Sequence, residues 1–195
     1  IDRALKLIGP NSLLIATRGQ IHMSYIMLGI RPDPKHLKMA EACLDDLKKE
    51  DPHSPYLYLL RGLIRYKQAR IQEAADDLKK VVEQNPNHPE GLLYLGIVYV
   101  LAGRANEAEN LFTRLVEVDP LTAVNHIMPG YVKAVRGDLK GAVPHYYKAY
   151  KMEPQNPMLI LMMGILPGRV EPPEEIVPIL MDLEPLEPFH IFGRV

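Results

Sequence analysis

Histidine, cysteine and carboxylate side chains are the residues of this 195-residue chain that could bind a metal ion or act in catalysis. The seven histidines are His22, His36, His53, His88, His126, His145 and His190. None of them forms an HExxH pair, and none has the single cysteine, Cys43, at metal-ligand spacing. We therefore expect no metal site and no bound cofactor.

Three pairs of adjacent carboxylates could in principle work as acid and base. They are Asp45-Asp46, Asp76-Asp77 and Glu174-Glu175, and all lie in segments that read as helices. Helical pairs of this kind are typical of solvated faces and helix-end charges. The chain also has no Gly-x-Ser-x-Gly elbow, and no glycine-rich loop follows a strand. The sequence therefore predicts no enzyme and no catalytic residue.

Composition excludes several other classes of protein. Hydrophobic residues make up 47% of the chain, which excludes a disordered protein. With a net charge of −1, the chain has no excess of positive charge with which to bind the phosphates of nucleic acid. The most apolar window, 158–166, is far shorter than the roughly 20 residues of a membrane helix. With one cysteine and no leader pattern, we expect a cytoplasmic location and, because Ile1 opens within a helical pattern, a fragment of a longer chain.

The elements that would position any functional residue come from an internal repeat. Three series of residues recur with a step of 34, for example 96 − 62 = 34: Gly62, Gly96, Gly130 and Gly164; Pro52, Pro86, Pro120 and Pro154; and Ala74, Ala108 and Ala142. Small residues in the middle of a helix let two helices approach closely, and proline cannot continue a helix. A second breaker lies between them at Gly103 and Gly137, with Ala69 in its place once. Each unit therefore reads helix, turn, helix, turn.

The landmarks of the best-formed unit resemble the tetratricopeptide repeat (TPR). Residues 89–122 carry them at Leu95, Gly96, Tyr99, Gly103, Ala108, Phe112 and Pro120. The resemblance extends to repeats at 55–88 and 123–156 and to a divergent repeat with an insertion at 11–54, in which Gly19 falls too early. Residues 1–10 read as the end of a preceding repeat, and 157–195 as a degenerate terminal repeat with a proline-rich acidic tail.

The resemblance implies an all-α, right-handed superhelical solenoid of antiparallel helix pairs. First helices are expected near 12–28, 55–68, 89–102, 123–136 and 157–166. Second helices are expected near 35–50, 71–84, 105–118, 139–151 and 173–183. The run 119–130 is also similar to repeats at the carboxyl end of large bacterial signalling proteins.

In this family the ligand usually contacts the exposed side of the first helices, which line a concave groove. The corresponding residues here are Tyr56, Leu59, Leu63, Tyr66, Leu93, Ile97, Val100, Leu101, Ile127, Tyr131, Val135, Met158 and Leu161. This face is mostly apolar, so we expect something to cover it. Either the array or its tail covers it, or a segment of a partner does.

Several positions depart from the family pattern. The carboxylate clamp that holds acidic chaperone tails is absent, since its positions hold Leu59, Leu63, Tyr94, Val124 and Met128. Arg61 and Arg65 stand where apolar residues are usual. We expect their stems to pack while their head groups reach solvent or carboxylates, with Asp45 and Asp46 as the candidates. The alternative is a binding pair for an acidic group. Pro129 and Pro144 fall inside helices and should kink them.

The tail is acidic and rich in proline. From residue 157 onward there are two basic and six acidic residues, a difference of 2 − 6 = −4. We expect residues 173–183 to cap the array. The alternative is an interaction peptide at Phe189, Ile191 and Phe192 that docks on a neighbouring copy.

The sequence predicts a protein–protein interaction scaffold that binds a protein or peptide segment through the apolar concave groove, with no nucleic-acid or membrane partner. One alternative is a homo-oligomerisation module that uses the groove or the tail. The other is an accessory domain of a larger kinase, cyclase or transcription regulator.

Overall fold

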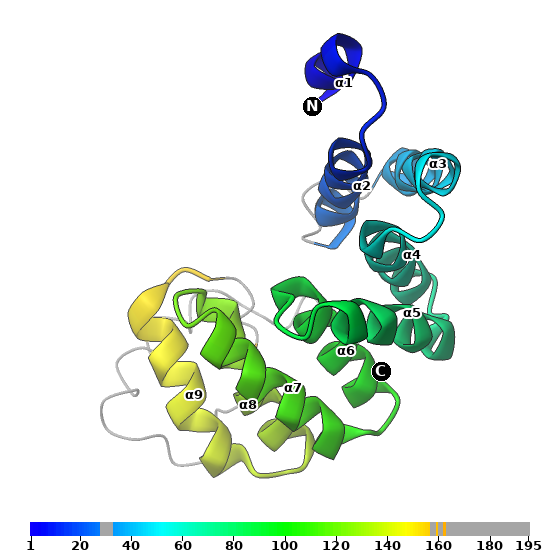
Figure 1. Ribbon diagram of the computed structural model, residues 1–195. Helices are drawn as coiled ribbons and strands as arrows, with labels where there is room; N and C mark the ends of the chain where they lie inside the picture. Colours follow the sequence, from blue (N-terminus) through cyan, green and yellow to red (C-terminus); the bar gives the residue numbers. More distant parts are fainter. Residues whose placement is uncertain (28–32, 157–158, 160–161, 163–195) are drawn as a thin grey trace. The chain divides into compact units, whose positions relative to one another are not determined.

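The computed structural model describes residues 1–27, 33–156, 159 and 162. Within these residues every regular element is an α-helix (Figure 1). The predicted helix at 173–183, the acidic tail and the groove positions Met158 and Leu161 lie outside the described residues.

The helices coincide closely with the predicted ranges. They are α1 (Asp2–Ile8), α2 (Ser12–Met27), α3 (Pro34–Glu50), α4 (Pro55–Lys67), α5 (Ile71–Gln84), α6 (Pro89–Leu101), α7 (Ala105–Val118), α8 (Ala123–Val135) and α9 (Leu139–Met152). Leu159 and Met162 are also helical. The predicted all-α class is confirmed.

The chain divides into two compact units, and the division falls between Arg104 and Ala105. Unit 1 holds α1 to α6, in which α2 packs on α3, α4 on α5, and α4 also contacts α2 and α6. Unit 2 begins with α7 to α9, in which α8 packs on both α7 and α9. The repeat boundaries expected at residues 54, 88, 122 and 156 stay predictions.

Proline and a left-handed residue mark the helix ends. Proline occupies the first position of α3, α4 and α6, where its missing N–H costs no helix hydrogen bond. The turns between α6 and α7 and between α8 and α9 contain Gly103 (φ 74°) and Gly137 (φ 85°). Ala69 takes the same left-handed conformation between α4 and α5 (φ 59°), although it is not a glycine. The prediction that Ala69 takes the place of glycine in this turn is therefore confirmed.

The repeating glycine allows close helix contact. A Cβ added to Gly62 would lie 2.8 Å from Leu78 Cγ of α5, and one on Gly130 would lie 2.7 Å from Tyr146 Cε1 of α9. Gly19 would meet Leu60 Cδ2 of α4 at 2.5 Å. Carbon atoms do not approach this closely, so a larger residue at any of these positions would force the neighbouring side chain to move.

Gly19 is in register, which corrects the expectation that it falls too early. It is the eighth residue of α2, just as Gly62, Gly96 and Gly130 are the eighth residues of α4, α6 and α8. The extra residues of this repeat therefore follow Gly19. They lengthen α2 to 16 residues and α3 to 17, against 13 and 14 for α4 and α5.

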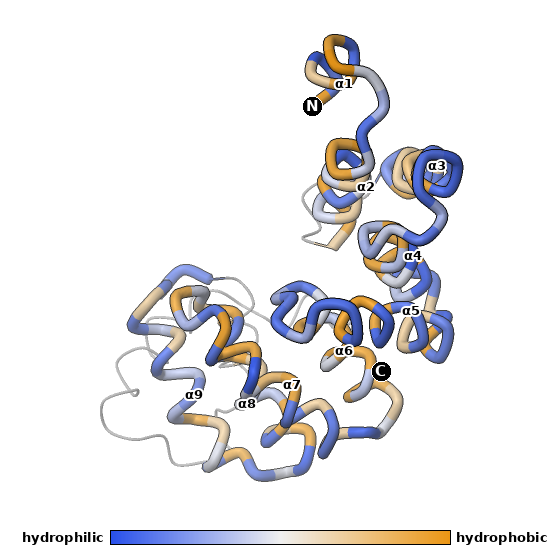
Figure 2. The backbone as a smooth tube through the Cα atoms, viewed as in Figure 1, coloured by the Kyte–Doolittle hydropathy of each residue, from blue (hydrophilic) through white to orange (hydrophobic). Residues whose placement is uncertain are grey.

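Helices such as α5 and α7 mix apolar and polar residues, as expected for helices buried on one side, whereas α6 is apolar along most of its length (Figure 2). Pro129 lies inside α8 and Pro144 inside α9, and both helices continue through their prolines. Neither proline ends a helix.

Candidate functional site

Two arginines of α4 share a buried carboxylate. Arg61 donates from Nε and Nη2 to the two oxygens of Asp77 at 2.8 and 2.7 Å, and Arg65 Nη1 donates to Asp77 Oδ2. The Asp77 side chain is 2% exposed. Its hydrogen bonds raise the pKa of Arg61 above the usual value. The cluster holds α4 against α5.

This cluster corrects two expectations. The head groups of Arg61 and Arg65 do reach carboxylates, but the partner is Asp77 of the following helix and not Asp45 or Asp46. Asp77 is buried, whereas its neighbour Asp76 is exposed. The adjacent pair therefore does not form a single solvated patch, because consecutive residues of a helix point in different directions.

The predicted groove residues of α4 differ in exposure. Leu59 and Leu63 are 1% and 3% exposed and belong to the core of unit 1. Tyr56 and Tyr66 are half-buried and reach the surface. Of the predicted residues on this helix, the two tyrosines are therefore the ones accessible to a ligand.

On α6 the predicted residues form a stripe that becomes more exposed along the helix. Leu93 and Ile97 are half-buried, and Leu101 is 51% exposed. Val100 is 7% exposed and packs in the core. Glu90, Leu93, Ile97 and Leu101 follow the spacing of one helix face, so the accessible apolar side chains share a surface with a carboxylate.

The described residues of unit 2 that were predicted for the groove lie on α8. Ile127 is fully buried, Tyr131 is half-buried, and Val135 is 52% exposed. Burial raises the pKa of Tyr131 above the ordinary phenol value. Of these three residues on α8, Tyr131 and Val135 are therefore the accessible ones.

Side chains connect the first helices of unit 1 directly. Gln20 Nε2 of α2 donates to Glu90 Oε2 of α6 at 2.7 Å, and this hydrogen bond is exposed to solvent. The rings of Tyr66 (α4) and Tyr94 (α6) lie 6.3 Å apart at 50°. Burial, with smaller contributions from Glu90 and Tyr66, raises the pKa of Tyr94 to about 12. We call Gln20, Tyr66, Glu90 and Tyr94 the first-helix cluster.

Sequence reasoning missed the role of Gln20. The expected register places its neighbour Gly19 too early, so Gln20 is not expected on the groove side of the first helices. The position of Gly19 as the eighth residue of α2, equivalent to Gly96 in α6, is the signal that would have found it.

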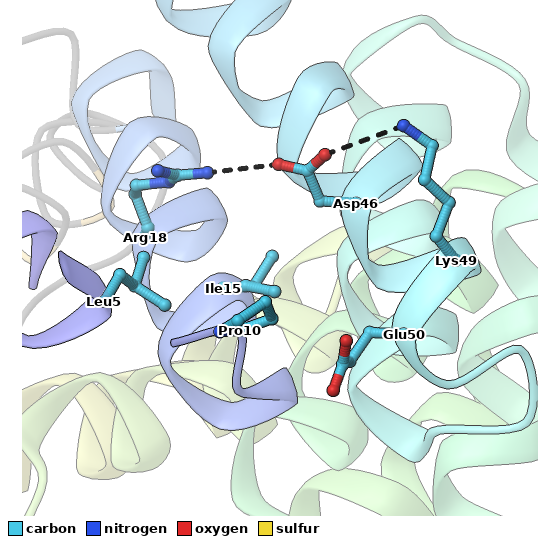
Figure 3. A pocket seen from close by; sticks show the side chains of 7 residues that line it. All are labelled: Leu5, Pro10, Ile15, Arg18, Asp46, Lys49 and Glu50. Atoms are coloured by element: carbon cyan, nitrogen blue, oxygen red, sulfur yellow. Dashed lines mark hydrogen bonds and ion pairs between the residues drawn. The ribbon is translucent and has the colours of Figure 1, made fainter. Parts of the chain in front are cut away.

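A separate cleft of about 360 Å³ lies between α1, α2 and α3 (Figure 3). It is lined by Leu5, Pro10, Ile15, Arg18, Asp46, Lys49 and Glu50. Arg18 and Lys49 both form ion pairs with the carboxylate of Asp46. Arg18 Nε also donates to the buried Cys43 Sγ at 3.2 Å. These side chains stabilise the helix contacts and show no arrangement for acid–base work.

Two buried polar side chains of α8 bond to the turn that precedes it. Asn125 Nδ2 donates to the carbonyl of Asp119 at 2.8 Å, and His126 Nε2 lies 2.8 Å from the carbonyl of Pro120. Both anchor the turn before α8. Across residues 1–27, 33–156, 159 and 162, no three His, Cys, Asp or Glu side chains come together as a metal site would require.

Comparison with known families matches this architecture. Two family profiles, each described as a tetratricopeptide repeat, match residues 65–128 and residues 40–89. Their overlapping ranges run from α3 into α8. The chain is a tetratricopeptide repeat protein. Among curated proteins, no sequence matches it.

Solved structures share the TPR fold at low identity. A thermophilic TPR protein of Thermus thermophilus, TTC0263, is 19% identical, with a TM-score of 0.65 over 78% of this chain and 80% of that one. YrrB, described as a TPR protein with an unusual peptide-binding site, is 22% identical, with a TM-score of 0.59 over 85% of this chain and 80% of that one.

TPR repeats also occur next to an enzyme. A Thermobaculum terrenum O-GlcNAc transferase is 19% identical, with a TM-score of 0.54, over 57% of this chain and 21% of that one. The TPR fold in general indicates a scaffold for protein–protein interaction. None of the helices in the described part of the chain combines the length and the apolar content that crossing a membrane requires.

Proposed function

We propose that this TPR protein is a non-catalytic scaffold that holds a polypeptide segment on the first-helix face of unit 1. That face consists of the accessible side chains of α2, α4 and α6: Gln20, Tyr56, Tyr66, Glu90, Leu93, Tyr94, Ile97 and Leu101. The observation that carries the proposal is the apolar stripe of α6, which ends in Leu101 at 51% exposure. Accessible apolar side chains along one helix face, here two half-buried and one exposed, favour a surface that a partner covers.

The structure narrows the groove predicted from the sequence. Leu59, Leu63, Val100 and Ile127 are buried, so the proposed contact surface is limited to the half-buried and exposed positions. Tyrosine and leucine at its centre, with a charged residue at its edge, resemble the apolar core and polar rim of a protein interface. The peptide-binding site of YrrB, a similar fold, agrees with this class of ligand.

The test begins with peptides selected from a random phage-displayed library against the wild-type protein. The affinity of a selected peptide is then measured for wild type and for Leu93→Glu with Ile97→Glu. Two carboxylates placed in an apolar contact should weaken binding at least tenfold, or about 1.4 kcal/mol. The matched control is Met39→Glu with Ala42→Glu, which makes the same kind of change on exposed positions of α3.

Equal affinity of the folded Leu93→Glu, Ile97→Glu protein and wild type would refute the face as the binding site. Failure to select any peptide would refute peptide binding. Light scattering on the same proteins tests the self-association alternative, since a dimer that only the α6 double variant dissociates would assign the face to a second copy.

A further inference from the structure

Glu90 carries an exposed negative charge on the proposed binding face. Its carboxylate accepts a hydrogen bond from Gln20, a neutral amide, and no ion pair to Glu90 occurs among the described residues. A carboxylate bound by an amide forms a weaker contact than one bound by a guanidinium, whose N–H donors are charged. A cationic ligand could therefore replace Gln20 with a gain in interaction energy.

Two aromatic rings lie beside this carboxylate. Tyr66 and Tyr94 are tilted by 50° with centroids 6.3 Å apart, and Glu90 acts electrostatically on Tyr94. The pKa of Tyr94, about 12, keeps its phenol neutral at physiological pH. Neutral tyrosine rings attract cations through the negative potential of their faces.

The three parts of the cluster come from three helices. Gln20 belongs to α2, Tyr66 to α4, and Glu90 and Tyr94 to α6, and α4 contacts both α2 and α6. The Gln20–Glu90 hydrogen bond consequently links the two helices on either side of α4. Neither side chain is buried, so the bond can break without exposing core.

We propose that this first-helix cluster is a seat for an arginine side chain of the bound polypeptide, in which Glu90 releases Gln20 to pair with the guanidinium, and the guanidinium stacks on the accessible part of the Tyr66 ring. This rests on the proposed function and adds its ligand chemistry. Arginine fits better than lysine because a planar guanidinium both pairs bidentately with a carboxylate and stacks on aromatic rings. The leucine and isoleucine of α6 then contact apolar residues that flank the arginine.

The seat favours cationic ligands, whereas a carboxylate clamp binds acidic peptides. An acidic segment would meet the like charge of Glu90, and the clamp positions hold Leu59, Leu63 and Tyr94. Lys67, at the end of α4, is exposed, but the cluster itself contains no cation.

Peptide selection tests the seat directly. Peptides selected by wild type should be enriched in arginine flanked by apolar residues. Changing that arginine to glutamine should weaken binding to wild type about tenfold, and the same change should have little effect on binding to Glu90→Gln. Selection by Glu90→Arg should instead favour acidic peptides.

A matched pair of variants separates charge from structure. Glu90→Gln and Gln20→Ala both alter the Gln20–Glu90 contact, but only the first removes the charge. We expect Gln20→Ala to bind the arginine peptide as tightly as wild type or more tightly, because the carboxylate is already free. If both variants lost binding equally, the contact would be structural and the seat would be wrong.

The outcomes also distinguish the two proposals. Selected peptides without a basic residue, which lose affinity with Leu93→Glu and Ile97→Glu, would overturn the arginine seat and leave the scaffold intact. Absence of any selected peptide would overturn both. Melting temperatures of all variants, compared with wild type, show whether each protein is folded.

Discussion

At the scale of single residues, the ion pairs of Asp77 connect α5 to α4. Asp77 accepts hydrogen bonds from both arginines of α4 while its own side chain is 2% exposed. Removing one partner of a buried ion pair leaves charges without compensation, which costs more than the pair itself contributes. The side chains of Arg61 and Arg65 are 25% and 22% exposed, so water reaches part of each.

We predict that Asp77→Ala lowers the free energy of unfolding by about 3 kcal/mol, at the lower end for a broken buried pair. Urea denaturation followed by circular dichroism measures it. Asp76→Ala is the control, because Asp76 is exposed on the preceding position, and it should change stability by less than about 0.5 kcal/mol. A loss of under about 1 kcal/mol for Asp77→Ala would mean that the cluster contributes little.

Ala69 offers a second test at this scale. Its φ of 59° is unfavourable for alanine, and Gly103 and Gly137 hold the equivalent turns at φ 74° and 85°. We predict that Ala69→Gly stabilises the protein by about 1 kcal/mol, since glycine adopts this conformation without the Cβ clash. The reverse change, Gly103→Ala, should destabilise by a similar amount. Thermal unfolding of both variants checks the pair, and a stabilising Gly103→Ala would contradict it.

At the scale of helices, the prolines of the sequence have different consequences. Pro89 starts α6, where a missing N–H costs nothing, whereas Pro144 is exposed on α9 and lies beyond its first turn. There it removes the hydrogen bond that residue 144 would donate to the carbonyl of Lys140.

We predict that Pro144→Ala raises the free energy of unfolding by about 1 kcal/mol, because the restored helix hydrogen bond exceeds the entropy that the unfolded chain gains. Pro89→Ala should give no such gain. Denaturant unfolding of the two variants compares them directly. Equal effects would show that the position of proline in the helix is unimportant here.

Helix existence and most helix ends could be predicted from the sequence, because glycine, alanine and proline at a step of 34 fix the repeat and its breakers. The side-chain partners could not. Arg61 pairs with Asp77 and Gln20 with Glu90, over 16 and 70 residues of sequence. Such pairs depend on how helices stack, which the repeat pattern alone does not specify.

The same limit applies to the candidate face. Its helices were predictable from the TPR resemblance, and so was the register of α4 and α6, but the register of α2 was not. Which of its apolar residues are accessible was not, because Leu59 is 1% exposed while Leu101, another predicted groove residue on the next first helix, is 51% exposed. Exposure depends on neighbouring helices, and these differ along the array.

At the scale of the whole molecule, two histidines couple stability to pH. Burial lowers the pKa of His145 in unit 2, helped by the positive charge of Lys133. Burial also lowers the pKa of His22 in unit 1, helped by His36, whose Nδ1 lies 3.0 Å from that of His22. Nearby acids, Glu109 and Asp2, oppose these shifts but do not outweigh them.

We predict that stability is full above the ordinary histidine pKa of about 6.5 and falls as the pH drops below it. The unfolded chain binds protons at a higher pH than the folded one, so acid favours unfolding. Urea midpoints at about pH 7.5 and about pH 5.5 measure the loss. The double variant His22→Gln, His145→Gln should show a smaller change in urea midpoint between the two pH values. An unchanged difference would mean that other groups cause the pH dependence of stability.

The central claim is that the first-helix face of unit 1 holds a polypeptide segment. Its most direct test is the change in methyl NMR shifts when a selected peptide is added to the wild-type protein. The account predicts shifts at Leu93, Ile97 and Leu101 of α6, with Met39 of α3 unaffected. Shifts confined to α3 and α5, with the α6 methyl groups unchanged at saturation, would contradict it.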